Sequence, residues 1–429
     1  MESRRTILKA GTAMIGGAFL GIKAGPAASR QTVPSRQASV TGPIKGGTRG
    51  RPFGAFFGDI SGHGYIEEEY FIAGEAQRFR PRGSLTPDGK WTFSPAGTAP
   101  FRTRILVRRP RDPAKFNGTV VVEWTNVTSG FELSFADSPS VYEGMAHVVV
   151  SAQQVGLHGY PGDKAQGLLQ WDARRYGELS HPGDSCCYDI FSQVTRLVGP
   201  KRPNTGPDPM GGLEVSKLIA VGASQSAMCL TGYFNAIQPN EGIFDAFMIL
   251  ISPGGVTGYD DKVYSPPDAE MMARFRTPVR LRDDLATPVI VLNSEAETLS
   301  YLGARQPDSP TFRYWEIAGA SHAPTDMVRL FDEKIVRDGL PAFTDPLHHG
   351  SDVMWRPSYD AALMHMHRWL HGGPPPPSQP RIDVVACDAP YIERDVYGNA
   401  KGGVRLPELV VPTARYLGLD PRPGGGGLF

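Results

Sequence analysis

Short apolar runs recur along the chain and are separated by segments that are polar or have helical spacing. Six of these runs have the length of a strand and are mostly apolar, which is typical of strands covered on both faces. They occupy residues 119–124, 146–151, 218–221, 246–251, 289–292 and 312–317. Helical spacing appears at residues 188–198, 228–237 and 359–370. Strands that alternate with helices predict an α/β fold, with a mostly parallel central sheet and helices on both of its faces.

The segments before and between these runs have a different pattern. Residues 65–73 and 102–109 read as strands on either side of a turn-rich stretch at 81–100, which predicts an antiparallel opening to the sheet. Two longer insertions, 155–182 and 254–288, lack clear sheet character. Ligands of parallel sheets bind at the carboxyl ends of the strands, so we expect these insertions to form the walls or a lid of a site.

The first 28 residues have the pattern of an export signal. Arg4 and Arg5 precede an apolar run at 10–22, which is shorter than the ~20 residues that a membrane-spanning helix needs. This pattern resembles a twin-arginine signal peptide, cleaved near Ala28. We therefore expect the twin-arginine export machinery to deliver a folded protein that is periplasmic or secreted.

The rest of the chain divides by composition into three parts. Residues 29–51 are rich in Gly, Pro, Ser, Thr and Arg and predict a flexible linker. Residues 52–373 contain the alternating strands and helices and form the expected catalytic domain. Residues 374–429 begin with a proline run and are expected to be a C-terminal extension that packs on the catalytic domain.

Charge and cysteine content exclude some kinds of partner. The chain has 429 residues, with 44 Lys plus Arg against 44 Asp plus Glu, so no net charge favours nucleic acid or an anionic membrane. The four cysteines, at positions 186, 187, 229 and 387, fit no zinc-site spacing. We expect no metal, while the disulfide pattern and the oligomeric state stay open.

A candidate nucleophile lies at the end of the apolar run 218–221. Gly222-Ala223-Ser224-Gln225-Ser226 follows this run and leads into a helix-forming segment. A strand that enters a tight turn with serine at its apex is the nucleophile-elbow pattern, in which the flanking positions must be small. Ser226 stands where glycine is usual and is the one departure. The pattern predicts Ser224 as the nucleophile.

A serine nucleophile needs a base and an acid, and hydrolases with this elbow carry them in the order serine, acid, histidine. His322 lies in a small-residue loop directly after the run 312–317, which predicts that it is the base. Glu295 and Glu297 both follow the run 289–292. The spacing after Ser294 favours Glu297 as the triad acid, and Glu295 remains the alternative.

The negative charge of a tetrahedral intermediate also requires hydrogen-bond donors. One donor should be the backbone amide of Gln225, which directly follows the nucleophile. The other should come from the loop after the run 119–124, where Asn126 or Val127 is the candidate.

Several motifs together resemble a known superfamily. Besides residues 222–226 and Gly319-Ala320-Ser321-His322, they are the segments 122–127, 151–153, 181–185 and 395–407. The chain is similar to the α/β-hydrolase superfamily, and more narrowly to a bacterial group of exported, mostly uncharacterised esterases known as "alpha/beta hydrolase domain" proteins. The resemblance implies an α/β-hydrolase fold with lid-like insertions and an ester-hydrolysing activity. Gln153 and Asp184 belong to these motifs, and both a place at the site mouth and a buried structural role stay open for them.

These residues lead to one main functional hypothesis. Ser224, His322 and Glu297 predict a serine hydrolase that cleaves a small-molecule carboxylic ester through an acyl-enzyme, without a cofactor. An acyltransferase would use the same triad, and a non-catalytic binding protein could retain the fold. The substrate stays open.

Overall fold

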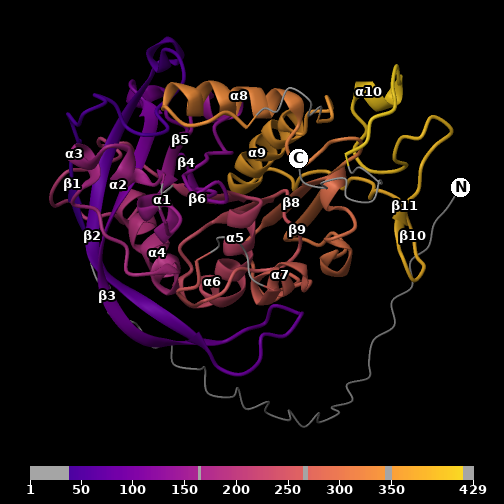
Figure 1. Ribbon diagram of the computed structural model, residues 1–429, viewed down its shortest axis with the longest axis horizontal. Coiled ribbons are helices and arrows are strands. Elements are labelled where there is room, and N and C mark those ends of the chain that lie inside the picture. Colours follow the sequence, from indigo (N-terminus) through magenta and orange to yellow (C-terminus); the bar gives the residue numbers. More distant parts are fainter. Residues whose placement is uncertain (1–37, 163–165, 264–268, 344–349, 419–429) are drawn as a thin grey trace, which may run out of the picture. The chain divides into compact units, whose positions relative to one another are not determined.

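A nine-stranded sheet organises the part of the chain that the computed structural model describes, residues 38–162, 166–263, 269–343 and 350–418. The export signal expected over residues 1–28 lies outside these ranges. The strand order is β1-β2-β3-β5-β4-β6-β7-β8-β9 (Figure 1). The strands are β1 (Ser39–Thr41), β2 (Tyr65–Pro81), β3 (Phe93–Pro110), β4 (Thr119–Trp124), β5 (Ala146–Val150), β6 (Lys217–Ala223), β7 (Ala246–Leu250), β8 (Val289–Ser294) and β9 (Phe312–Ile317).

The six apolar runs of the sequence are the strands β4 to β9. All neighbouring pairs among these six are parallel, whereas β1, β2 and β3 pair antiparallel and β3 joins β5 antiparallel. The prediction of a mostly parallel sheet with an antiparallel opening is therefore confirmed. The parallel arrangement also brings the carboxyl ends of β4 to β9 to one edge of the sheet.

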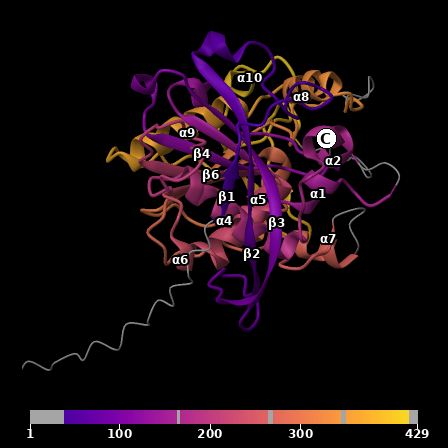
Figure 2. The same cartoon turned by 90° about the vertical axis from the view of Figure 1, so that its left-hand side faces the viewer.

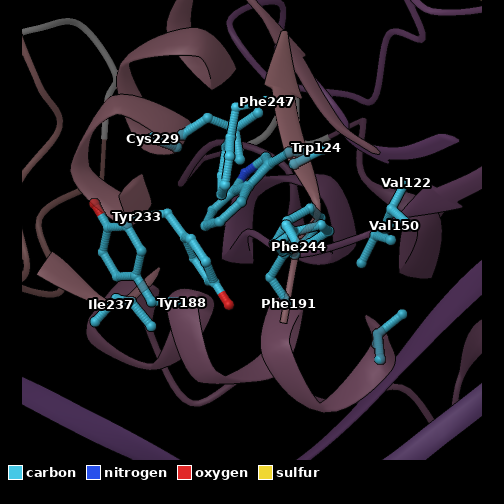
Figure 3. Close-up of a cluster of buried hydrophobic side chains, with 14 of the residues drawn as sticks. Val122, Trp124, Val150, Tyr188, Phe191, Cys229, Tyr233, Ile237, Phe244 and Phe247 are labelled. Carbon is cyan, nitrogen blue, oxygen red and sulfur yellow. The ribbon is translucent and has the colours of Figure 1, made fainter. Parts of the chain in front are cut away.

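Helices cover both faces of this sheet, as the sequence predicted. Residues of β4 alternate between two apolar clusters: Val122 packs with the helices α4 and α5, whereas Val121 packs with α8 and α9. Figure 3 shows the first cluster, in which Trp124 lies 4.8 Å from Phe191 between ring centroids. The helices are α1 (Gln154–His158), α2 (Leu168–Trp171), α3 (Ala173–Tyr176), α4 (Cys187–Val198), α5 (Gln225–Ala236), α6 (Gln238–Glu241), α7 (Ala269–Arg276), α8 (Thr325–Arg337), α9 (Arg356–Leu370) and α10 (Pro407–Val410).

The hairpin of β2 and β3 is longer than the sequence predicted. Strand β2 reaches Pro81 and β3 already begins at Phe93, so residues 93–100 of the stretch that we expected to be turns are strand, and only 82–92 connect the two strands. The pairing has a register shift between Gln77 and Phe79. Pro95 and Pro100 fit in this strand because β3 pairs with β5 only from Ile105 to Arg108, and residues 93–101 pair with β2 alone. Figure 2 shows the hairpin from the side on which it lies.

Residues 38–51 differ from the flexible linker that we expected over 29–51. Strand β1 pairs antiparallel with β2, and the Ile44 amide donates to the Glu69 carbonyl at 2.8 Å. Arg51 forms an ion pair with Asp338 at 3.0 Å. Composition alone suggested mobility, but these long-range bonds make residues 38–51 part of the folded unit, and residues 29–37 lie outside the described ranges.

The C-terminal segment packs along the edge strand β9. The Val404 amide donates to the Glu316 carbonyl at 2.7 Å, and the Ala318 amide donates to the Val404 carbonyl at 3.1 Å. A short hairpin, β10 (Val384–Val385) and β11 (Tyr391–Ile392), lies in this segment. These bonds cover an edge that would otherwise expose unpaired backbone groups. Within the described ranges, no helix combines the length and the apolar character needed to cross a bilayer.

Candidate active site

The strained turn after β6 carries Ser224. Its backbone has φ 58° and ψ −120°, a combination that side-chain-bearing residues rarely adopt and that is often found at functional sites. The Ser224 amide donates to the Leu250 carbonyl of β7 at 2.9 Å, which ties the turn to the neighbouring strand. Helix α5 begins at the next residue. The sequence prediction of a strand, a sharp turn and a helix around Ser224 is confirmed.

Small residues are required on both sides of this turn. A Cβ atom at Gly222 would lie 2.7 Å from the backbone oxygen of Ser226, closer than real Cβ contacts allow. Ser226, the departure from glycine, is used by the turn itself. Its hydroxyl accepts from the Ala223 amide and donates to the Ala223 carbonyl, both at 2.9 Å. The hydroxyl thus supplies bonds that a glycine could not make.

The loop after β9 brings His322 to the serine. His322 Nε2 lies 3.0 Å from Ser224 Oγ, although 98 positions separate the two residues in the chain. The ring is buried, with 5% of the residue exposed, and the His322 carbonyl accepts from the Trp355 indole at 3.2 Å. Gly319 makes the loop possible, because it has φ 76° and a Cβ there would lie 2.7 Å from Leu409.

Glu297 lies on the other side of the imidazole. Its Oε1 atom is 2.6 Å from His322 Nδ1. Its Oε2 atom accepts from the Ser294 amide at 2.9 Å and from the Ser294 hydroxyl at 2.7 Å, which forms a capping box around the turn Glu295–Glu297. The carboxylate is therefore held by the end of β8 and is presented to the histidine.

Glu295, the alternative acid, forms hydrogen bonds with groups other than His322. Its Oε2 accepts from the Gly319 amide at 2.7 Å, and its Oε1 accepts from Arg394 at 2.8 Å. Glu295 is fully buried, so the arginine of the C-terminal segment compensates a charge that would be costly to bury alone. Of the two glutamates, the structure places Glu297 at the imidazole and Glu295 between two loops.

The structure supports the backbone amide of Gln225 as a possible oxyanion donor but not that of Asn126. The Gln225 amide is at the first position of α5, where no earlier turn of the helix supplies a carbonyl acceptor. The prediction of Asn126 is wrong: its amide donates to the Leu133 carbonyl at 3.0 Å, and its side chain donates to the Ala223 carbonyl at 3.1 Å. Through this side-chain bond, Asn126 instead stabilises the backbone just before Ser224. Val127, the alternative from the sequence, remains a candidate, and it lines the same cavity as Gln225.

This cavity is small, with a volume of about 30 Å³, and adjoins the elbow through Gln225. Gln153, after the end of β5, and Asp184 line it, whereas Ser224 and His322 do not, so a place at the site mouth stays a prediction for both residues. Burial raises the pKa of Asp184 to about 6. The two insertions contribute to the walls through Val155 and Thr257, among others.

Some of these residues carried no sequence signal. Gln153 did carry a sequence signal, because it follows the end of a predicted strand, as the other candidates do. Other residues of the cavity wall carried none. Thr257 and Cys229 lie in an insertion and on α5, and nothing in their local sequence marks them. The Thr257 hydroxyl donates to Cys229 Sγ at 3.4 Å in the cavity wall.

Comparison with known proteins identifies a family. The model of the family described as "Alpha/beta hydrolase domain" matches residues 40–429. None of the curated protein sequences is a detectable relative of this chain.

Solved structures with a related arrangement have low overall similarity. A ferulic acid esterase from Streptomyces cinnamoneus has 13% identity and a TM-score of 0.36, over 71% of this chain and 92% of that one. A fungal esterase from Rhizomucor miehei has 11% identity and a TM-score of 0.30, over 72% and 83%. Prolyl oligopeptidase B from Galerina marginata has 10% identity and a TM-score of 0.29 over 58% of this chain, which spans only 40% of that protein. At these scores, the likenesses say nothing about activity.

Proposed function

Because the chain belongs to the alpha/beta hydrolase domain family, we propose that it is a serine hydrolase that cleaves a carboxylic ester of a small molecule. One observation carries this proposal. Ser224 Oγ, the two ring nitrogens of His322 and the Glu297 carboxylate form a continuous chain with spacings of 3.0 and 2.6 Å. A hydroxyl, an imidazole and a carboxylate in this order are the groups that activate a serine.

The proposed reaction begins with the attack of Ser224 Oγ on the ester carbonyl. His322 Nε2 takes the hydroxyl proton as the new C–O bond forms, and Glu297 stabilises the resulting imidazolium through Nδ1–H. The tetrahedral intermediate then collapses, and the leaving alcohol takes the proton from His322. Water attacks the acyl-serine with His322 again as the base, which releases the carboxylic acid and restores Ser224.

The charge on the former carbonyl oxygen would be stabilised by backbone amides. The Gln225 amide is one donor, because it lies at the start of α5 where the helix dipole also favours negative charge. The Val127 amide is the other candidate donor. Removal of a single donor of this kind typically lowers kcat by about 10²- to 10³-fold.

A panel of p-nitrophenyl esters of increasing acyl length tests this proposal. We expect turnover of at least one ester, and a loss of roughly 10⁴-fold or more in the variant Ser224→Ala. Ser39→Ala, on the edge strand β1, is the matched control and should retain wild-type rates. Wild-type protein that cleaves none of the esters, or Ser224→Ala that cleaves them normally, would contradict the proposal and favour a binding protein.

We also propose that residues 1–28 direct twin-arginine export to the periplasm or the medium. The paired arginines and the short apolar run support this proposal. Full-length protein expressed in a bacterium with this pathway should appear outside the cytoplasm with a new N-terminus near residue 29. Replacement of Arg4 and Arg5 by lysine should retain it inside, and unchanged export would contradict the proposal.

A further inference from the structure

The loop that carries His322 is held through its backbone as well as through the imidazole. At the start of this loop, the Gly319 amide donates to the Glu295 carboxylate at 2.7 Å, and the Ala320 carbonyl accepts from the Glu295 amide at 3.0 Å. Both bonds come from the turn that also carries Glu297. They hold the first two residues of the loop, whereas the backbone of His322 itself is bound by a different segment, which lies just before α9.

Trp355 binds the backbone of His322. Its indole N–H donates to the His322 carbonyl at 3.2 Å, and only 1% of Trp355 is exposed. An indole nitrogen can only donate, and a buried one needs an acceptor, so this bond fixes the indole against the loop. Trp355 directly precedes α9, and its own carbonyl accepts from the Tyr359 amide at 3.1 Å in the first turn of that helix. The indole is therefore supported by a helix that packs on the sheet.

Ser351 belongs to the same segment and binds both ends of the loop. Its hydroxyl donates to the Gly319 carbonyl at 2.6 Å and accepts from the Val353 amide at 3.2 Å. Because the amide must donate, the hydroxyl proton is left for the Gly319 carbonyl. The Ser351 carbonyl accepts from the amide of Thr325, where α8 begins, at 3.2 Å. We call residues 351–355 the strap, since they bind the loop before, at and after its histidine.

The place of the imidazole depends on the backbone that carries it. Glu297 is 2.6 Å from Nδ1 and orients the ring, while Nε2 must lie within hydrogen-bond distance of Ser224 Oγ, here 3.0 Å. A shift of about 1 Å between reacting groups can lower a rate by about 10²-fold. A bond that holds the His322 backbone therefore contributes to the distance over which the proton moves.

We propose that the strap positions His322 for proton transfer, and that Trp355 is the residue that holds its backbone in place. Trp355 acts through the His322 carbonyl, so it is a positioning residue rather than a catalytic one. This inference rests on the proposed function, because it takes His322 to be the base. Its consequence is that loss of the indole N–H slows the chemical step while the binding of an ester changes little.

Phosphonylation of Ser224 by a fluorophosphonate tests the proposal without a known substrate. We expect the rate to fall about tenfold or more in Trp355→Phe, because the His322 backbone loses its donor. On a p-nitrophenyl ester that the wild type cleaves, kcat should fall while KM changes little. Trp315→Phe is the matched control: Trp315 is also buried, and its indole N–H donates to the Pro377 carbonyl at 3.0 Å. It should react at the wild-type rate even if its stability falls.

Two further variants separate the N–H bond from the size of the ring. β-(3-Benzothienyl)alanine at position 355 keeps the shape of tryptophan but has sulfur in place of the N–H, and it should react as slowly as Trp355→Phe. If neither variant folds, Ser351→Ala removes the other bond of the strap, and the rate should fall about threefold or more. Ser216→Ala is its control, because the Ser216 hydroxyl also donates to a glycine carbonyl, that of Gly118, at 3.0 Å. Its rate should equal that of the wild type.

The outcomes separate this inference from the proposed function. Wild-type rates of phosphonylation in the variants of the strap overturn the inference and leave the hydrolase proposal standing. A wild-type rate with benzothienylalanine also overturns it, because the shape of the ring and not its N–H is then sufficient. Equal slowing in Trp355→Phe and Trp315→Phe overturns it as well, since the loss then reflects stability. Wild-type protein that is not labelled at Ser224 at all counts against the proposed function itself.

Discussion

Glu297 Oε1 lies 2.6 Å from His322 Nδ1, and this contact links the end of β8 to the loop that follows β9. The other carboxylate oxygen is bound by the amide and the hydroxyl of Ser294. The acid is thus oriented by the strand end before it, and the imidazole is oriented by the acid.

The roles of the two neighbouring glutamates can be separated by matched variants. Glu297→Gln should lower kcat by roughly 10²- to 10⁴-fold, because an amide cannot stabilise the imidazolium that forms during catalysis. Glu295→Gln should retain most of kcat but lower the free energy of unfolding, because Arg394 loses its buried partner. Steady-state kinetics and urea unfolding of both variants check this. The reverse pattern, with Glu295→Gln inactive, would contradict our assignment of the acid.

Ser294 should act by positioning Glu297. In Ser294→Ala the carboxylate loses its 2.7 Å hydroxyl bond, and we expect kcat to fall by about threefold to tenfold with KM little changed. Ser300→Ala is the control, since the Ser300 hydroxyl donates to the Glu297 backbone carbonyl and not to its carboxylate. Equal effects on kcat in the two variants would show that the hydroxyl of Ser294 does not orient the acid.

The elbow should be sensitive to a single methyl group at Gly222. Gly222→Ala places a Cβ 2.7 Å from the Ser226 backbone oxygen, so we expect a loss of about 2–3 kcal/mol in the free energy of unfolding, together with lost activity. Gly62→Ala is the control, because it has open space around it and no positive φ. Thermal and urea unfolding of both variants measure the difference. A neutral Gly222→Ala would mean that the turn can open without cost.

Asp184 should make stability fall as pH rises from about 4 to 6. Burial raises its pKa from 3.8 to about 6, so the folded state binds more protons than the unfolded chain in this window. The contribution is at most about 3 kcal/mol, at 1.36 kcal/mol per pKa unit. In Asp184→Asn this slope should be absent from the free energy of unfolding measured across the window.

Asp208→Asn serves as the control for this pH dependence. Its hydrogen bonds with Arg202 and backbone amides lower the pKa of Asp208 although partial burial opposes them, so its effect on stability should change only below about pH 4. The opposite sign of the two variants distinguishes a local effect of Asp184 from a general effect of acid. Identical slopes in wild type and Asp184→Asn would contradict the raised pKa.

The sequence predicted the central sheet well, because strands buried on both faces are apolar throughout and stand out from their surroundings. The hairpin β2–β3 and the strand β1 were harder to predict, since their Gly- and Pro-containing segments are held by partners far away in the chain. The prediction of a flexible linker over 29–51 was wrong for residues 38–51 for the same reason. Local composition does not record such long-range pairing.

The candidate site shows the same limit. Ser224 and His322 each follow a strand, and their positions in the chain were sufficient to select them. Asn126 was also selected by its position, but its amide donates to the carbonyl of Leu133, seven residues later. The sequence around Asn126 does not indicate this backbone pairing. Similarly, the partner that occupies Glu295 is Arg394, 99 positions away.

Labelling with a fluorophosphonate, followed by mass spectrometry of the peptides, tests the central claim most directly. The phosphonate should bond to Ser224 Oγ in wild-type protein, and labelling should slow strongly in His322→Ala, because the imidazole no longer takes the hydroxyl proton. Glu295→Gln should label at close to the wild-type rate. A phosphonate found on a different residue, or labelling of Ser224 that is as fast without His322, would contradict the account.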